Sequence, residues 1–475
     1  LGFDDPAVPA RRLGEWRSGK ARSVRSPAAQ QAFEAMLPGL LQAIAAGTDP
    51  DRALNRLSDI VERLSSGVNF FRLLEARPAL ARLLAKILAH APALADQLAR
   101  RPELFEGLFD ASSFELPPPP AEFADLLSRA MRGHPYDVAL DRVRRLVNER
   151  RFALGVQLID RHRDPLAVAG GYARVAEGAI EALGNAATRA FEEAHGRIPG
   201  AELLVLGLGR LGGCALTHAS DLDIIYLHTA APGSRSDGAR PLGPNDYFNR
   251  LASRVTAALS VPTAAGPLYD VDVRLRPEGA KGMLVVSLDA FEHYQRSNAW
   301  TWEHMALCRA RPIFGSPEVR ERASAAIESI LRVDRDRLET VKDAVKMRAE
   351  MELHKPARSK LDVKLGPGGL VDLEFAVHVL QLTRHVGLDP RLEVALEQLL
   401  SENFIEQNII DSQQLLTRIL VMMRLVAPGD VKPTAGTWQL VAEACGAGSW
   451  DELLAQHDSA RQSIARLWNS IRQEA

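Results

Sequence analysis

Two aspartates separated by one residue, Asp221 and Asp223, open the apolar run DLDIIYLH. This run has the composition of a strand, and because side chains alternate between the faces of a strand, both carboxylates should point to the side opposite Leu222. Two like charges at the mouth of an apolar strand repel each other and resist desolvation. A hard divalent cation such as Mg²⁺ removes both penalties. Such a pair is also common on protein surfaces, so it needs support from elsewhere in the chain.

A second predicted strand supplies that support. In YDVDVRLRP, alternation predicts an apolar face and a charged face, and the charged face carries Asp270, Asp272, Arg274 and Arg276. A carboxylate here offers a third metal ligand, and arginines bind phosphates bidentately. The structural alternative is a row of salt bridges, in which the arginines pair with Asp270 or Glu278. The aspartates of the two strands together indicate a two-metal site for phosphoryl or nucleotidyl transfer.

A glycine cluster precedes the aspartate pair. LLVLGLGRLGG contains Gly207-x-Gly209-x-x-Gly212, the pattern of a dinucleotide-binding turn. That fold requires a crossover of roughly a dozen residues or more before the next parallel strand, and an acidic residue at the end of that strand. Only eight residues separate Gly212 from Asp221, which stands at the start of its strand. We therefore expect a strand, a phosphate-binding glycine turn, one short helix and a second strand. A purely structural turn is the alternative.

The elements that position these residues form a small unit of strands and helices in the middle of the chain. Its predicted strands are AELLVLG, DLDIIYLH, LYDVDVRLRP and GMLVVS, with the loop APGSRSDGARPLGPND and the helix DYFNRLASRVTAALS between them. Helical periodicity covers about residues 27–110 and 121–194 and returns after about residue 288. LDVKLGPGGLVDLEF interrupts the last region with a short extended piece and a glycine turn.

Prolines mark two boundaries in the N-terminal part. Pro78 opens the helix ALARLLAKILAH, whose apolar face is Leu80, Leu83, Leu84, Ile87 and Leu88. The run from Pro117 to Pro120 predicts a stiff extended connector. We expect a mostly helical α+β chain with a small mixed sheet. The predicted regions are a helical N-terminal or linker region (1–195), a catalytic domain (196–330) and a C-terminal helical domain (331–475).

Composition narrows the class of protein. The chain has 475 residues and a formal net charge of −2, which gives no global basic field for nucleic acid. The arginines of DRVRRLVNERRF are interleaved with acidic residues and favour a solvated helix face over a nucleic-acid patch. The three cysteines are far apart in sequence, which argues against a disulfide framework and a zinc cluster and favours the cytoplasm. No apolar run is long enough to span a membrane. Because the chain begins with Leu and not Met, we expect a piece of a longer polypeptide.

The glycine turn, the aspartate pair and the third aspartate resemble the signature of the polymerase-β-like nucleotidyltransferase superfamily. The spacing from Gly213 to Asp221 is shorter than in most of that superfamily and is similar to that of the glutamine synthetase adenylyltransferase family, the bifunctional adenylyl-transferring and adenylyl-removing enzymes. The resemblance rests on four segments in the same order: GLGRLGGCALTHASDLDIIYLH, YDVDVRLRPEGAKGMLVVSLDAFEHY, AWTWEHMALCRARPIFG and LDVKLGPGGLVDLEFAVHVL. It extends more weakly into the N-terminal helices. AWTWEHMALCRAR resembles the C-terminal, transferring half of that family.

The resemblance implies a reaction and its residues. AMP would pass from ATP to a tyrosine of glutamine synthetase, with two Mg²⁺ ions held by Asp221, Asp223 and Asp272, and with Asp272 helping to take the phenol proton. The residues implied to bind the nucleotide are Gly212 and Gly213 through their backbone N–H groups, Ser220, Arg274, Arg276 and Lys364. For Ser220, a capping role is the alternative. A PII-type signal protein and glutamine as effector are implied as well, with no nucleic-acid or membrane partner. The alternatives are the adenylyl-removing half, which works by phosphorolysis, and a non-catalytic regulatory half.

The sequence leaves the roles of several other residues open. Arg210, Ala215 and His378 depart from the residues common in the family, and none of them belongs to the aspartate set. Asp372 and Glu374 either join the nucleotide site or complement a helix N-terminus. Glu303 and Arg309 either support the sheet or reach the site. Trp300 and Trp302 are expected in the core.

Overall fold

The computed structural model describes residues 3, 5, 7–47, 49–64, 66–109, 111–428 and 432–473. They divide into two units, of which unit 1 comprises residues 1–116, 149–168 and 418–455, and unit 2 comprises residues 117–148, 169–417 and 456–475. Longer helices contribute residues to both units: α8 (Tyr136–Ile159), α9 (Pro165–His195), α18 (Gln407–Val426) and α20 (Trp450–Arg472). No helix in the described ranges is both long enough and apolar enough to cross a membrane.

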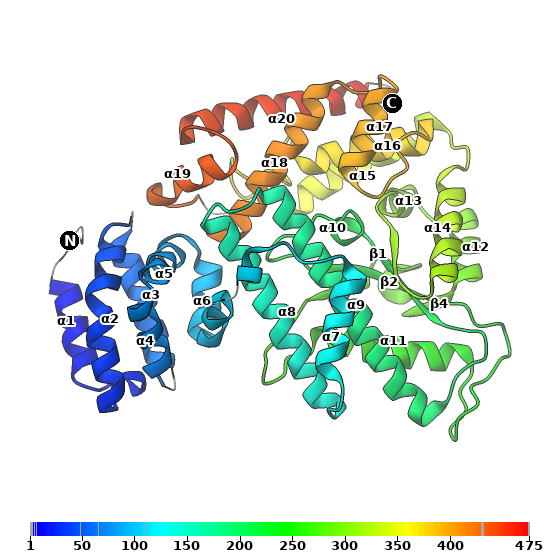
Figure 1. The fold of residues 1–475 in the computed structure, drawn as a ribbon. Helices are drawn as coiled ribbons and strands as arrows, with labels where there is room; N and C mark the ends of the chain where they lie inside the picture. Colours follow the sequence, from blue (N-terminus) through cyan, green and yellow to red (C-terminus); the bar gives the residue numbers. More distant parts are fainter. Residues whose placement is uncertain are drawn as a thin grey trace. The chain divides into compact units, whose positions relative to one another are not determined.

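Unit 1 is built from helices that pack in layers, with α2 against α4 and α5, and α3 against α5 and α6 (Figure 1). Local capping starts them where the sequence predicts. Ser26 accepts a hydrogen bond from the Ala29 N–H at the start of α2, and Pro78 occupies the first turn of α5. The predicted apolar face of α5 is buried except at Leu80, which is half-buried. The elements that lie wholly within unit 1 are α1 (Ala7–Arg17), α2 (Pro27–Ala45), α3 (Pro50–Arg63), α4 (Val68–Ala76), α5 (Pro78–His90), α6 (Pro92–Arg100), α19 (Ala435–Ala444), η1 (Arg22–Val24), η2 (Pro102–Phe109) and η3 (Ala111–Phe114).

Unit 2 contains a five-stranded mixed sheet in its described residues, with the order β3-β2-β1-β5 and β4 paired to β2. β1 pairs antiparallel with β2 and β5, whereas β3 and β4 run parallel to β2. All five residues of β1 are buried, as expected for the centre of a sheet. The strands are β1 (Leu203–Gly207), β2 (Leu222–His228), β3 (Val271–Asp272), β4 (Val285–Ser287) and β5 (Arg311–Phe314). The direct antiparallel pairing of β1 with β2 excludes the dinucleotide fold, which needs a parallel crossover at this point.

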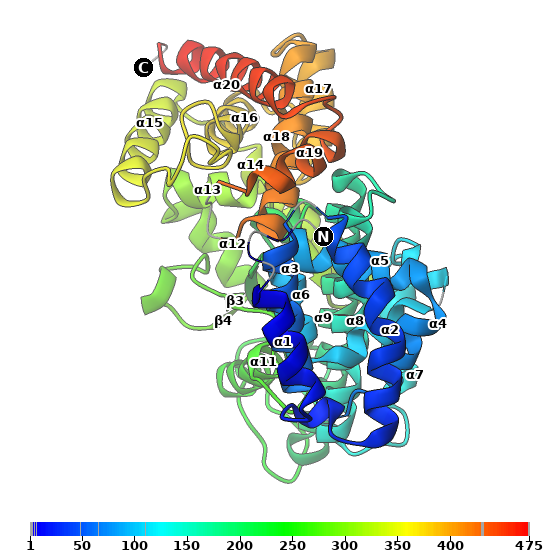
Figure 2. The same cartoon turned by 90° about the vertical axis from the view of Figure 1, so that its left-hand side faces the viewer.

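Helices cover this sheet. α11 packs against β3 and β4, α12 against β2 and β4, and α14 against β5. Figure 2 labels β3, β4, α11 and α12 in this part of unit 2. The helices of unit 2 are α7 (Pro120–Met131), α10 (Gly209–Gly212), α11 (Pro244–Ser260), α12 (Leu288–Ser297), α13 (Thr301–Leu307), α14 (Pro317–Leu331), α15 (Arg337–His354), α16 (Leu370–Arg384) and α17 (Leu392–Ser401), with the 3₁₀ turn η4 (Gly279–Lys281). The mostly helical α+β class with a small mixed sheet is confirmed. The division at residues 195 and 330 concerns functional regions and stays a prediction.

Two predicted extended segments are wrong, and a third is one residue too long. The strand expected over YDVDVRLRP is only Val271–Asp272, because the Asp272 carboxylate accepts the Arg274 backbone N–H at 2.9 Å and turns the chain. Residues 361–369 form turns, because Asp362 Oδ1 accepts from the backbone N–H groups of Lys364 and Leu365. Pro120 belongs to α7 as its first residue, so the extended connector ends one residue earlier.

Two further differences concern β5 and Trp300. β5 was not predicted, because its residues, RPIF, are few and lie between helical patterns. The Trp300 side chain is not in the core and is 69% exposed, since it lies in the turn that starts α13.

The expectation of a solvated face on α8 is wrong for Arg144, which is 1% exposed. Its guanidinium donates to the carbonyls of Ala258 and Val261 at 2.8 and 2.9 Å, at the end of α11. The last carbonyls of a helix lack partners within it, so this contact satisfies the buried Ala258 carbonyl and the partly buried carbonyl of Val261, which follows the helix.

We expect Arg144→Ala to lower the free energy of unfolding by about 3 kcal/mol, because it removes a buried side chain and leaves those carbonyls without donors. Arg145→Ala is the matched control: this neighbour is exposed, and its loss should cost about 0.5 kcal/mol or less. Urea unfolding of the two variants measures the difference. Equal destabilisation would contradict the capping role.

Candidate metal centre

The three predicted aspartates lie together. One oxygen from each of Asp221, Asp223 and Asp272 can be chosen so that all three lie within 4.8 Å of one another. The sheet explains this: β2 and β3 run parallel with Asp223 opposite Asp272, and the Leu222 N–H donates to the Asp270 carbonyl at 2.9 Å. Leu222 is buried, so the two carboxylates that flank it project to the other side, as predicted. Asp270 itself is exposed and is not part of this group.

The charges of these three carboxylates favour a bound cation. Burial, followed by the charges of Asp221 and Asp272, raises the pKa of Asp223 to about 6. Asp272 has the opposite tendency, because hydrogen bonds from the Arg274 side chain hold its pKa below the ordinary value. Three carboxylates at this separation suit the oxygen-ligand preference of Mg²⁺, and a divalent cation would relieve the repulsion that perturbs Asp223. The residues present therefore fit the metal that the sequence predicts.

The glycine turn is packed directly against this group. The Leu208 N–H donates to the Asp223 carbonyl at 2.9 Å. Gly209 has φ +54°, and a Cβ there would lie 2.6 Å from Asp223 Oδ2, so only glycine fits both the backbone angle and the space. Gly212 is equally constrained, because a Cβ would lie 1.9 Å from the Arg309 carbonyl oxygen.

The phosphate-binding role expected for the N–H groups of Gly212 and Gly213 meets an obstacle. Both groups donate within the turn, to the carbonyls of Leu208 and Gly209 at 2.9 and 3.0 Å. In this conformation they are not available to a phosphate. The glycines instead let Arg309 and Asp223 approach the backbone closely, which is a packing requirement that the sequence pattern alone did not separate from phosphate binding.

The other predicted nucleotide-binding residues differ in their surroundings. Ser220 Oγ accepts from the Thr217 N–H at 2.9 Å and so closes a turn, which is neither the phosphate contact nor the helix or strand cap considered from the sequence. Arg274 pairs with Asp272 at 2.5 Å, and its side chain is 76% exposed. The structural alternative for this arginine, an ion pair, is therefore present, but its partner is Asp272 instead of Asp270 or Glu278. Lys364 is half-buried and close enough to lower the pKa of Asp223.

Arg276 does not face the carboxylates. Its guanidinium donates to the carbonyls of Val273, Ala280 and Gly282, so it braces the turn that ends β3. The charged strand face that placed Arg276 beside Asp272 does not exist, because the strand ends at Asp272.

The residues left undecided fall into two groups. Asp372 and Glu303 are structural: Asp372 pairs with buried Arg348 at 2.5 Å, and Glu303 accepts from the Trp300 N–H at 2.9 Å at the start of α13. Arg309 and Glu374 pair with each other at 2.5 Å beside the glycine turn. Burial opposes ionisation of Glu374, but the charges of Arg309, Arg210 and Lys364 outweigh it and hold its pKa below the ordinary value.

His378 lies in the same surroundings. Burial lowers its pKa to about 4, so its imidazole is neutral at physiological pH.

Sequence reasoning missed one pair that touches the turn, Glu177 and Arg311, which are joined at 2.5 Å. Arg311 lies within a segment that carries the family resemblance, and this is the signal that could have identified it. Glu177 lies in the helical pattern of α9, where nothing distinguishes it from a surface acid. All three cysteines, Cys214, Cys308 and Cys445, are free thiols, as predicted.

Comparisons with known proteins show the family to which the chain belongs. The family model described as glutamate-ammonia ligase adenylyltransferase matches residues 81–326, and that described as GlnD PII-uridylyltransferase matches residues 342–471. The chain is 39% identical to the bifunctional glutamine synthetase adenylyltransferase/adenylyl-removing enzyme of Mesorhizobium japonicum, over 82% of this chain and 40% of that protein. It is 37% identical to the enzyme of the same name from Agrobacterium fabrum, over 99% of this chain and 48% of that protein.

The corresponding enzyme of Rhizobium meliloti is 36% identical over 99% of this chain and 49% of that protein. The chain thus spans about half the length of the curated relatives that it matches. The first family model covers just over half of the chain, across the aspartate group and the glycine turn. On this evidence the chain belongs to the glutamate-ammonia ligase adenylyltransferase family.

Proposed function

We propose that this chain transfers AMP from ATP to a tyrosine hydroxyl of glutamine synthetase, with the aspartate group as its catalytic centre. The observation that carries the proposal is the meeting of Asp221, Asp223 and Asp272 within 4.8 Å, directly after a glycine turn, in a member of an adenylyltransferase family. The names of the relatives cover both adenylyl transfer and adenylyl removal, and this chain matches about half of each relative. We assign it to the transferring half on the AWTWEHMALCRAR segment.

The carboxylates have distinct proposed roles. Asp221 and Asp223 hold Mg²⁺, whose charge, when it is bound, offsets that of the triphosphate and of the leaving pyrophosphate. Asp272 shares the metal site and accepts the proton of the attacking phenol. Its carboxylate is ionised at neutral pH, as a proton acceptor must be, but the hydrogen bonds from Arg274 that lower its pKa also make it a weaker base while that pair is in place.

Cationic side chains around the carboxylates bind the phosphates in this proposal. Arg274 is exposed, so its guanidinium is able to exchange Asp272 for a phosphate oxygen without breaking a buried contact. Lys364 acts on the same carboxylate group from the segment that precedes α16. Ser220 is a candidate donor in the arrangement where both the Thr217 N–H and the Thr217 hydroxyl, each 2.9 Å from Ser220 Oγ, donate to it and leave its own proton for a phosphate.

The proposal includes regulation. We propose control by a PII-type signal protein and by glutamine, in the cytoplasm. Its support is the family resemblance and the match of residues 342–471, which span α15 to most of α20, to a model described as a PII-uridylyltransferase.

Two opposed assays test the reaction. The chain is incubated with ATP labelled in its α-phosphate, Mg²⁺ and unmodified glutamine synthetase, and label is measured on tyrosine. In parallel, it is incubated with adenylylated glutamine synthetase and phosphate, and release of ADP is measured. Transfer in the first assay and little activity in the second is the expected result. ADP release alone would identify a removing half, and ATP binding without either reaction would identify a regulatory half.

A further inference from the structure

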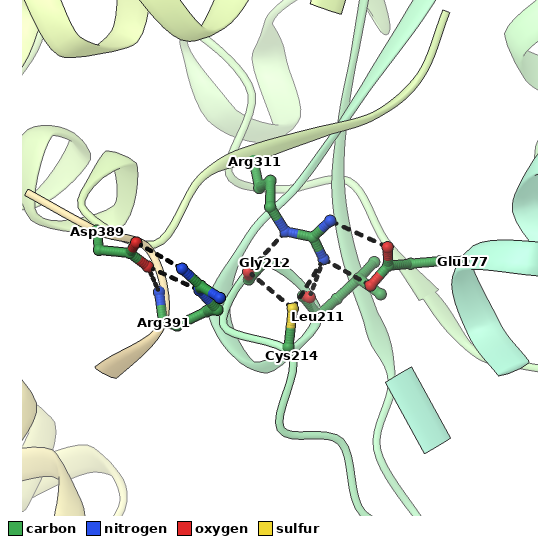
Figure 3. A network of polar contacts seen from close by, with 7 residues as sticks. All are labelled: Glu177, Leu211, Gly212, Cys214, Arg311, Asp389 and Arg391. Carbon is green, nitrogen blue, oxygen red and sulfur yellow. Dashed lines mark hydrogen bonds and ion pairs between the residues drawn. The ribbon is translucent and has the colours of Figure 1, made fainter. Parts of the chain in front are cut away.

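A second charged network surrounds the C-terminal end of the glycine turn (Figure 3). The guanidinium of Arg311, at the start of β5, lies between Glu177 of α9 and residues 211–214. Nη1 and Nη2 of Arg311 each donate to one oxygen of the Glu177 carboxylate, at 3.0 and 2.5 Å. Glu177 is only 7% exposed, whereas the Arg311 side chain is 27% exposed, so the carboxylate side of this pair is the side shielded from water and salt.

The same guanidinium is bonded to the turn. Arg311 Nε donates to the Gly212 carbonyl at 3.2 Å, Nη2 donates to the Leu211 carbonyl at 3.5 Å, and Nη2 also lies 3.1 Å from Cys214 Sγ. These carbonyls end the short helix α10, where backbone acceptors lack partners within the helix and a positive charge is favourable. Arg311 therefore ties the end of the turn to α9 and to β5.

The beginning of the turn is tied to the aspartate group. Its Leu208 N–H donates to the Asp223 carbonyl, and Gly209 lies so close to the Asp223 carboxylate that a Cβ would meet Oδ2 at 2.6 Å. In the sheet, Gly207, the last residue of β1, pairs with Arg311. A displacement of the turn would therefore press against, or withdraw from, the carboxylate that is most perturbed in the group.

We propose that Glu177 is a positioning residue of the metal centre: through Arg311 it holds the glycine turn against Asp223 and so fixes the spacing of the three carboxylates. This inference rests on the proposed function, since it assigns the carboxylates to metal binding. The alternative is a pair that only stabilises the fold. Buried ion pairs often add little stability, because desolvation offsets their attraction. A positioning residue changes the affinity of the site for a metal, and a merely stabilising one does not.

Three variants separate these roles. Glu177→Gln keeps the shape of the side chain and removes its charge, and Glu177→Asp keeps the charge and is the milder change if the first variant does not fold. Asp389→Asn is the matched control. Asp389 pairs bidentately with Arg391 and lines the same cavity of about 420 Å³ as Arg311, but in the described residues neither member of that pair bonds to the turn (Figure 3).

Two readouts do not depend on catalysis. The first is Mn²⁺ affinity, measured by electron paramagnetic resonance of the free ion. The second is the alkylation rate of Cys214, which follows Gly213 and lines that cavity, with buried Cys445, which does not line it, as the internal reference. We expect Glu177→Gln to weaken Mn²⁺ binding about tenfold and to speed alkylation of Cys214 about tenfold, with Glu177→Asp in between. Asp389→Asn should change the Mn²⁺ affinity less than about twofold.

The outcomes decide the matter. A Glu177→Gln protein that unfolds earlier but binds Mn²⁺ with wild-type affinity overturns the proposal, as does an equal loss of affinity in Asp389→Asn. If Glu177→Gln does not fold, wild-type affinity and thiol reactivity in Glu177→Asp overturn it as well. Failure of the proposed function looks different: the wild-type chain would then transfer no AMP, while its Mn²⁺ binding and thiol reactivity still respond to Glu177.

Discussion

Asp223→Asn should abolish AMP transfer and at the same time stabilise the metal-free protein. The asparagine keeps the shape of the side chain but removes the charge that a divalent cation and its nucleotide require, so we expect a loss of about 10³-fold or more in transfer. Without metal, the ionised carboxylate destabilises the folded protein, because burial and the neighbouring carboxylates raise its pKa to about 6. Activity and stability should therefore move in opposite directions.

The pH dependence of this stabilisation follows from linkage. A carboxyl whose pKa is raised in the folded state destabilises the fold progressively as pH rises from its unfolded pKa through its folded one, and fully above the latter. For Asp223 that window runs from the ordinary value of 3.8 to about 6. The shift corresponds to at most about 3 kcal/mol, and partial exposure reduces it, so we expect a gain of about 1–2 kcal/mol at neutral pH that disappears below about pH 4.

Urea unfolding in a chelator, at neutral and acidic pH, measures this gain, and the labelled-ATP assay measures transfer. Asp270→Asn is the control, because Asp270 is exposed, two residues from Asp272, and outside the carboxylate group. It should leave both quantities nearly unchanged. AMP transfer by Asp223→Asn, or a lower stability of this variant than of the wild type in the chelator, would contradict this prediction.

Gly212→Ala should have the largest effect on folding. A Cβ at this position would lie 1.9 Å from the Arg309 carbonyl oxygen and 2.5 Å from the Gly207 carbonyl oxygen, both of which are backbone atoms. Gly207 pairs with Arg311 in the sheet, and Arg309 lies two residues before that pair. A shift of either atom would disturb the adjoining pair of β1 and β5, so we expect a loss of about 3 kcal/mol or more. Thermal unfolding measures it.

Gly39→Ala is the matched control for this substitution. Gly39 lies inside α2, and a Cβ there has nothing within 4 Å. Alanine is the better helix former, so this variant should be more stable by up to about 1 kcal/mol. If Gly212→Ala were as stable as Gly39→Ala in thermal unfolding, the Arg309 carbonyl could not lie as close to the turn as described.

The sequence predicts the centre of the sheet well, because its signals are local. The buried run that became β1, the short gap to Asp221 and the alternation around Leu222 each depend on a few adjacent residues. The antiparallel pairing of β1 with β2 follows from that gap, since it is too short for a parallel crossover. The aspartate group was predicted for the same reason, as β2 and β3 each supply their carboxylates at the point where they pair.

The remaining errors arise from contacts between distant segments or from side chains that bond to their own backbone. Asp272 ended its strand early by accepting the Arg274 N–H, which turned Arg276 away from the site. Arg144 looked solvated because its acceptors, the last carbonyls of α11, are more than a hundred residues away. The turn glycines likewise matched a phosphate motif, whereas their N–H groups bond within the turn and their missing side chains make room for Arg309.

The most direct test of the metal centre is a titration of the wild-type chain and of Asp223→Asn with Mn²⁺, followed by electron paramagnetic resonance, with Asp270→Asn as the control. We expect saturable Mn²⁺ binding to the wild type and to Asp270→Asn, and an Mn²⁺ affinity about 100-fold lower or more in Asp223→Asn. Equal binding by all three proteins would contradict this expectation, because the three aspartates would then not hold the metal.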